Sequence, residues 1–223
     1  NITGHVQDIL KMAEDNNSTA SRTLQEASQL DTLALNLKEV SNVFKLGERG
    51  QQAMETHKRM PAIVRRAAQD IGRVLEDAVK AGQIKPDDLF DTHYVPIPNT
   101  KPQKYTSKFD ALTDKLFPPV QEPILDANKE VAYAGAVDLN GYFPTHNKRY
   151  TKPLTGDEKV DMVNNRTKRI FNDAVGKKCG AHEQPFLLQT YRRDTGEIMH
   201  DLSVPIYVQG RHWGGFRVGY RTE

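Results

Sequence analysis

The first 46 residues carry apolar side chains in a strict heptad pattern. Thirteen positions alternate at spacings of four and three, and ten of the thirteen are apolar. They are Ile2, Val6, Ile9, Ala13, Asn16, Ala20, Thr23, Ala27, Leu30, Ala34, Leu37, Ser41 and Phe44. A lone globular helix buries a broader stripe, so this regularity predicts a long helix that pairs with others in a coiled coil. Because no N-cap residue precedes the pattern, we expect it to continue a helix that starts upstream.

A polar stretch separates this helix from a second helical pattern. Gly47 offers a stop, and the polar residues 47–60 predict a linker, with a frayed extension of the helix as the alternative. We expect the second helix to begin at Pro61, because proline is favoured in a first helical turn, and to end at Gly82. Its apolar stripe consists of Ile63, Val64, Ala67, Ile71, Val74, Leu75, Ala78 and Val79.

The rest of the chain changes from irregular helical segments to strands. The prolines of Asp87–Thr100 predict an extended connection or an edge strand, and residues 109–117 predict a short helix that ends at the following prolines. A helix is expected over 159–175. Strands are expected over Val131–Leu139, Tyr142–His146, Pro185–Arg193, Ile198–Val208 and Trp213–Arg221, with tight turns at 140–141, 194–197 and 209–212. Five strands interrupted by one helix predict an α+β fold, a five-stranded antiparallel sheet with helices gathered on one face.

The charge distribution argues against a nucleic-acid-binding protein. Residues 1–46 hold four Lys/Arg and six Asp/Glu, and the remainder carries a net charge of +4. A nucleic-acid binder would need a concentrated basic face. One cysteine excludes an internal disulfide, and no apolar stretch approaches the roughly 18 residues that cross a bilayer. We therefore expect a soluble, cytoplasmic fragment without membrane contact, and any membrane anchor of the parent protein would lie upstream of Asn1.

Residues Thr23–Leu46 resemble the C-terminal end of the signalling hairpin of methyl-accepting chemotaxis proteins. The likeness rests on the Gln25-Glu26 pair, the small residues that follow it and the closing sequence LKEVSNVFKL. It implies a homodimer through the coiled coil, in which the parent receptor contacts the chemotaxis histidine kinase and a coupling protein. Gln25 and Glu26 resemble the pairs that receptor methyltransferases and deamidases modify. The alternative is that this pair is an ordinary solvated flank of the heptads.

Residues Pro61–Tyr220 resemble a single Cache domain, which is a PAS-like sensor module. The segments that carry the likeness are VDLNGY (137–142), THN (145–147), NR (165–166), RIFND (169–173), LLQTYRRDT (187–195), SVPI (203–206) and GRHWGGFRVGY (210–220). The variant it most resembles follows the signalling hairpin in some bacterial receptors. The two resemblances imply a coiled-coil end over 1–46, a linker over 47–60 and a sensor domain over 61–223.

Two arginines are the leading candidates for ligand binding in that sensor domain. Arg166 and Arg169 lie three apart on a predicted helix and therefore on one face. Two guanidiniums on a pocket wall would clamp a carboxylate or a similar small anion. The other candidates, on predicted strands or their ends, are Tyr142, His146, Gln189, Tyr191 and Asp201. Asp201 would either recognise an amine or hold an arginine in place, since an internal Asp–Arg pair is often a structural brace.

Cys179 and His182 have a spacing that could ligate a metal or haem. One cysteine and one histidine make only half of a typical zinc site, and the second cysteine of a covalent haem motif is missing. The simpler interpretation is that Cys179 is a surface-loop thiol whose thiolate form is favoured by Lys177 and Lys178. The sequence contains no phosphate-binding glycine loop, nucleophile elbow or zinc-protease motif, so we expect neither an enzyme nor a cofactor.

Three hypotheses of function follow from these patterns. The first is a dimeric sensor that binds a small, anionic metabolite and transmits the signal to the helical bundle. The second is a structural or protein-interaction domain that sets receptor dimerisation. The third is a haem or redox sensor that uses His182, His146 or Cys179.

Overall fold

The computed structural model describes residues 2–43, 47–192 and 197–222, and it divides the chain into two compact units, Asn1–Asn42 and Val43–Glu223. Phe44, Leu46 and most of the expected turn at 194–197 lie outside the described residues, as do the side chains of Ile2, Val6 and Ser41. No helix among the described residues is long and apolar enough to cross a membrane.

The first unit is the long helix that the heptad pattern predicts. Helix α1 spans Ile2–Val43 without a break. Large apolar side chains along it are at least half exposed, and three of them, Ile9, Leu30 and Leu37, occupy predicted heptad positions. The continuous helix is confirmed, and its pairing with other helices stays a prediction.

Helix α2 spans Gly47–Lys80, so the prediction that the second helix begins at Pro61 is wrong. Pro61 lies inside the helix, where it removes one backbone hydrogen bond to the preceding turn. The residues before Pro61 are mostly polar because only one stripe of α2 packs on the sheet, and the rest of the helix surface faces solvent. Ala53 and Met60 continue the buried stripe formed by Val64, Ala67, Ile71 and Leu75.

Short elements fill the chain between α2 and the end of the domain. They are α3 (Pro86–Leu89), β1 (Val95–Pro96), β2 (Tyr105–Thr106), α4 (Asp110–Leu116), α5 (Pro118–Ala127), η1 (Lys148–Tyr150), α6 (Glu158–Asn164) and α7 (Ala174–Ala181). The expected helix near 109–117 is α4, and the prolines that follow it begin α5, as proline at N1 or N2 allows.

Only the first part of the helix expected over 159–175 is helical. Helix α6 ends at Asn164, β5 (Arg169–Ile170) follows it, and α7 begins at Ala174, near the expected end. Asn165 ends α6 in an extended conformation, and Lys168 adopts a positive φ of 59°. The carboxylate of Asp173 then starts α7 by accepting from the backbone N–H groups of Val175 and Gly176. The local turn and cap chemistry thus divides a region whose apolar spacing alone suggests one helix.

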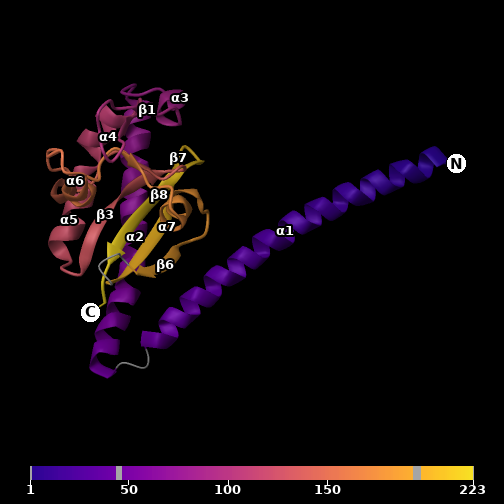
Figure 1. Cartoon of the computed structure of the whole chain (residues 1–223), viewed down its shortest axis with the longest axis horizontal. Coiled ribbons are helices and arrows are strands. Elements are labelled where there is room, and N and C mark those ends of the chain that lie inside the picture. The colour runs from indigo at the N-terminus through magenta and orange to yellow at the C-terminus, as the bar shows by residue number, and fades with distance from the viewer. Residues whose placement is uncertain (1, 44–46, 193–196, 223) are drawn as a thin grey trace. The chain divides into compact units, whose positions relative to one another are not determined.

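The main sheet has four antiparallel strands in the order β3-β8-β7-β6 (Figure 1). These strands are β3 (Val131–Asp138), β8 (Arg211–Tyr220), β7 (Ile198–Val208) and β6 (Leu187–Arg192). The α+β fold class is confirmed, but the sheet lacks the expected fifth strand. That segment forms β4 (Tyr142–Phe143), which pairs with β5 (Arg169–Ile170) in a separate two-stranded sheet.

Asp138 explains why β4 leaves the main sheet. Its carboxylate accepts from the backbone N–H groups of Asn140 and Tyr142, at 2.9 Å each. Because these N–H groups are satisfied by the side chain, the returning strand does not continue a ladder with β3. Phe143 then folds over Gly135, where a β-carbon would lie 2.5 Å from the Phe143 ring.

The two faces of the main sheet differ in chemistry. Helix α2 covers one face, and Figure 1 shows it crossing the strands. That face is apolar and includes Ala134, Leu202, Val204, Phe216 and Val218. The opposite face is packed by α7 and Phe143 and carries polar side chains, so the prediction that the helices gather on one face is wrong.

Candidate functional site

The polar face of the sheet presents two adjacent cross-strand rows. Tyr133 of β3, Asp201 of β7 and Gln189 of β6 align across the sheet with Gly219 of β8. Two residues along, Arg217 and Ser203 occupy the next row on the same face. We call Tyr133, Gln189, Asp201, Ser203 and Arg217 the polar layer.

A buried ion pair lies at the centre of the polar layer. The Arg217 side chain is 7% exposed and that of Asp201 is fully buried. The Nε group of Arg217 donates to Asp201 Oδ2 at 3.0 Å, and its Nη2 group donates to the Tyr133 hydroxyl at 3.0 Å. Tyr133 in turn donates to the Asp201 carboxylate. Asp201 therefore holds an arginine in place, which is one of the two roles expected for it.

The ion pair sets the protonation states around it. Burial by itself would lower the pKa of Arg217, but the Asp201 carboxylate outweighs burial and the pKa lies well above its usual value. Burial raises the pKa of Tyr133 well above 10, so its hydroxyl stays protonated and can donate. The centre of the polar layer is thus a fixed cation–anion–hydroxyl triad at neutral pH.

Cys179 belongs to this buried face, so its assignment as a surface-loop thiol is wrong. It lies on α7, is fully buried and donates from Sγ to Asp201 Oδ1 at 3.0 Å. Burial raises its pKa well above the usual value, which disfavours the thiolate. The Nε2 group of Gln189 donates to Val175 O at 3.1 Å and approaches the Cys179 sulfur at 3.4 Å. Both side chains therefore fasten α7 to the sheet.

His146 borders the polar layer beside Phe143. Its ring stacks on Phe143 with centroids 4.1 Å apart and meets Tyr133 edge-on at 6.0 Å. Nδ1 accepts from the Asn147 N–H at 2.8 Å. Burial, followed by the nearby Arg166 and Arg217, lowers the pKa of His146 well below 6.5. His146 is therefore a neutral aromatic acceptor in a positively charged environment.

Arg166 and Arg169 come together, although not on the helix that was predicted for them. Arg166 follows α6 in a turn, and Arg169 begins β5. Each guanidinium carbon lies 5.2 Å from the centre of the Phe171 ring. Burial and then Arg166 lower the pKa of Arg169 to about 10. The structure thus places two cations around one aromatic ring, within electrostatic reach of His146.

The contacts of Arg169 are with neutral groups throughout the described part of the chain. Its Nη1 donates to Met162 O at 3.2 Å, and its Nη2 lies 3.2 Å from the Met162 sulfur. Lys168, its neighbour, is matched instead by two carboxylates, with Asp114 at 2.9 Å and Asp110 at 3.4 Å. A half-buried guanidinium without a carboxylate partner is chemically suited to an external anion.

The structure separates Tyr142 from the other candidates. Its hydroxyl lies 3.0 Å from both Asp110 carboxylate oxygens, and its ring packs against Tyr94 and Phe109 in the main core. Tyr191 is half-buried on β6, two residues from Gln189 and so on the same face. His146, Arg166, Arg169, Gln189, Tyr191 and Asp201 remain on or beside the polar face.

The modification candidates lie in the first unit. Gln25 and Glu26 are exposed on α1, and Glu26 lies 3.7 Å from Arg22 in an exposed i,i+4 pair. Exposure is compatible with modification and equally with a solvated helix flank, so both interpretations of the pair stay open.

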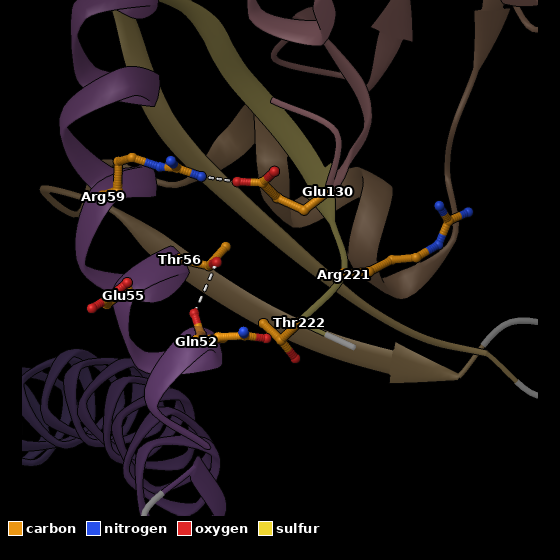
Figure 2. A pocket seen from close by; sticks show the side chains of 7 residues that line it. All are labelled: Gln52, Glu55, Thr56, Arg59, Glu130, Arg221 and Thr222. Atoms are coloured by element: carbon orange, nitrogen blue, oxygen red, sulfur yellow. Dashed lines mark hydrogen bonds and ion pairs between the residues drawn. The ribbon is translucent and has the colours of Figure 1, made fainter. Parts of the chain in front are cut away.

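Two hollows occur elsewhere in the described structure, and neither is lined by a predicted site residue. One, of about 400 Å³, lies between the start of α2 and the end of β8 (Figure 2). Its lining residues are Gln52, Glu55, Thr56, Arg59, Glu130, Arg221 and Thr222. The other, of about 370 Å³, lies between α2 and β7 around Gly72 and Tyr207.

The metal-binding potential of Cys179 and His182 is limited by their other contacts. Cys179 bonds Asp201, and His182 Nε2 lies 2.9 Å from Ser203 Oγ. Within residues 2–43, 47–192 and 197–222, no three His, Cys, Asp or Glu side chains gather closely enough to hold a metal ion. The described residues therefore provide no preformed set of metal ligands for the haem or redox hypothesis.

Sequence reasoning missed Tyr133, Ser203 and Arg217. The strand that contains Arg217 offered a signal, because glycines stand two residues before and after it, at Gly215 and Gly219. On a strand these three residues share one face, so the glycines leave room for a long inward-pointing side chain. An arginine in that pattern, beside a strand that carries Asp201, is a recognisable sign of a buried ion pair.

Comparison with known proteins leaves the family open. No family model matches the chain, and no curated protein matches it. Among solved structures, an extracellular ligand binding receptor from Desulfohalobium retbaense aligns with 15% identity over 73% of this chain. The alignment covers 25% of that structure, so this chain spans about a quarter of its length, and the TM-score is 0.30.

Proposed function

We propose that the unit Val43–Glu223 is a sensor that binds a small anionic ligand beside its polar layer. The observation that carries this proposal is the half-buried Arg169, whose contacts in the described chain are all neutral. Arg166, over the same ring, adds positive charge, and the buried His146 is uncharged. A carboxylate placed there would receive charge-assisted hydrogen bonds in a poorly solvated setting.

The polar layer supplies a means of response to such a ligand. Arg217 and Arg166 both lower the pKa of His146, so the ion pair and the proposed anion site are electrostatically connected. Cys179 and Gln189 link the same layer to α7. An anion that rearranged Arg166 or Arg169 would change the balance of these contacts and could shift the sheet and α7 between two arrangements.

The resemblances of the sequence extend this proposal to the parent protein. We infer a chemoreceptor fragment in the cytoplasm in which α1 pairs with other helices of a homodimer. The exposed Ile9, Leu30 and Leu37 support helix pairing, because they occupy heptad positions, where paired helices bury apolar side chains against each other. Signalling to the chemotaxis histidine kinase and its coupling protein belongs to the same proposal, as does a role without catalysis or cofactor.

Thermal-shift screening and calorimetry with small carboxylates, amino acids and nucleobases test the ligand proposal. A carboxylate at about 100 times its Kd should stabilise the protein by about 2.7 kcal/mol, or roughly 5–11 °C in Tm. Arg169→Gln should weaken binding at least about tenfold, the effect of losing one charge-assisted contact. The matched control Arg66→Gln removes an exposed arginine of α2 and should leave affinity unchanged.

Two results would contradict the proposal. One is the absence of stabilisation by any anion of the panel. The other is equal affinity of the wild-type protein and Arg169→Gln for an anion that does bind. If no anion binds and deletion of residues 61–223 abolishes dimer formation, the structural, dimer-setting hypothesis is favoured.

A further inference from the structure

Two histidines meet where the beginning of α2 contacts the sheet. The ring of His57, on α2, lies edge-on to the ring of His200, on β7, with centroids 4.7 Å apart and planes at 78°. His57 Nδ1 is 2.7 Å from the Tyr220 hydroxyl on β8. His200 is 3% exposed and is enclosed by the strands beside it. We call His57 and His200 the histidine pair.

The partners of the histidine pair are hydroxyl groups. His200 Nδ1 lies 2.9 Å from Thr190 Oγ1 of β6, and its Nε2 lies 3.1 Å from Thr222 Oγ1, just after β8. The buried Nε2 of His57 has no hydrogen-bond partner among the described residues. In that part of the chain no carboxylate bonds either ring, so a charged imidazole would have no adjacent counterion.

Four charged side chains line the groove of Figure 2, which adjoins the histidine pair through Thr222. Arg59 of α2 pairs with Glu130, which precedes β3, and Arg221 pairs with Glu197. Glu55 of α2 is exposed. Thr222 lines this groove and also bonds His200, so it connects the buried ring to a solvent-accessible space through which a proton can arrive.

The position of the pair on α2 gives its ionisation a mechanical consequence. From Met60 onward, α2 is held by completely buried apolar side chains such as Val64 and Ile71. Before Met60, the segment is held by fewer groups, namely the small buried Ala53, the Arg59–Glu130 ion pair and the His57 contacts with Tyr220 and His200. Burial lowers the pKa of both histidines, that of His200 to about 4, and His57 contributes to the shift at His200. Both rings are therefore neutral at pH 7, and the contact is made in that state.

We propose that the histidine pair is a proton-operated release, in which acidification places two like charges between α2 and the sheet and frees residues 47–59 of the helix. The apolar contacts from Met60 onward stay in place, so the release is local. Residues 47–59 are the part of α2 nearest to α1 in the sequence, so a change in their packing affects the segment that links the sensor unit to the preceding chain. The release needs no ligand and is independent of the proposed anion site.

Hydrogen exchange of the full chain between pH 7.5 and 4.5, corrected for the intrinsic rate, tests the release. The protection factors of peptides from residues 47–59 should fall at least about tenfold as the pH falls, whereas those of peptides from 67–80 should stay the same. The loss should shrink to less than about threefold in His57→Gln/His200→Gln. The control His93→Gln removes an exposed histidine and should behave as the wild-type protein does.

Three results would overturn the release. The first is equal loss of protection along the whole of α2, which would indicate global unfolding. The second is an unchanged pH dependence in the double variant. The third applies even if that variant does not fold: NMR titration of the wild-type imidazoles that gives His57 and His200 pKa values above 6.5 would show that folding does not hold these rings neutral.

Discussion

The Arg217–Asp201 ion pair offers the sharpest test of how the polar layer is held together. Arg217→Met removes the cation and leaves the fully buried Asp201 carboxylate with Tyr133 and Cys179 as donors. Breaking one side of a buried ion pair costs about 3–5 kcal/mol because the remaining charge stays buried. For a unit of this size, that corresponds to a fall in Tm of roughly 6–20 °C.

The double variant Asp201→Asn/Arg217→Met separates charge burial from packing. The asparagine Oδ1 can still accept from Tyr133, and methionine fits the space between Gly215 and Gly219. Because both charges are removed together, the double variant should regain most of the loss and lie within about 2 kcal/mol of the wild-type protein. The control Arg66→Met breaks an exposed pair on α2 and should cost less than about 0.5 kcal/mol.

Urea unfolding followed by fluorescence measures these differences directly. Trp213 is the single tryptophan, is 2% exposed and packs against Phe109 and Phe117, so its emission reports the core of the second unit. The reasoning is refuted if Arg217→Met costs less than about 1 kcal/mol, or if the double variant is as unstable as the sum of the two single variants.

Three further predictions concern other parts of the domain. Burial lowers the pKa of His182 to about 4, so its neutral form stabilises the fold above pH 6.5 and this contribution is lost as the pH falls. In urea unfolding, the free energy of unfolding of His182→Gln should fall by about 2 kcal/mol less than that of the wild-type protein between pH 7.5 and 5. An equal fall in both proteins would contradict this. Cys179 is fully buried with a raised pKa, so an aromatic disulfide reagent at pH 8 should react with it only after unfolding; rapid labelling of the native protein would show that α7 opens. A β-carbon on Gly72 would lie 2.7 Å from the Tyr207 carbonyl oxygen. Gly72→Ala should therefore lower the free energy of unfolding by about 1–3 kcal/mol, although alanine has the better helix propensity. A stabilised variant would refute the close approach of α2 and β7.

The hydrophobic pattern was sufficient to predict the main strands and the long first helix. Alternation and turn residues place β3, β7 and β8 close to their observed bounds. The start of α2 could not be predicted in this way, because residues 47–59 are polar and contact the sheet along one narrow stripe. Pro61 then appears as a natural first-turn residue, although the helix passes through it.

The arrangement of the site depended on side-chain chemistry that periodicity does not contain. Asp138 and Asp173 each satisfy backbone N–H groups, which turns β4 out of the main sheet and starts α7 at the end of the region where one continuous helix was expected. Arg166 and Arg169 were predicted to act together on a helix face. They do converge, but through a turn and a strand that bring both to Phe171.

Of the two roles proposed for Asp201, the structure shows the one in which it holds an arginine, and recognition of a ligand amine stays a prediction. It was not possible to foresee that the arginine it holds is Arg217, because that pairing requires the register of β7 against β8. Cys179 was misplaced for a similar reason. Its lysine neighbours in sequence point to a surface loop, whereas the helical turn of α7 directs the thiol to the sheet.

The most direct test of the proposed anion site observes Arg169 itself. In protein labelled with ¹⁵N-arginine, the Nε–H resonances can be followed by NMR during titration with acetate, succinate and L-glutamate, and assigned with Arg169→Lys and Arg166→Lys. We predict a saturable shift of the Arg169 resonance with at least one carboxylate, together with slower solvent exchange of its Nε–H. Shifts confined to exposed arginines such as Arg66, or linear changes that never saturate, would contradict a ligand site at this position.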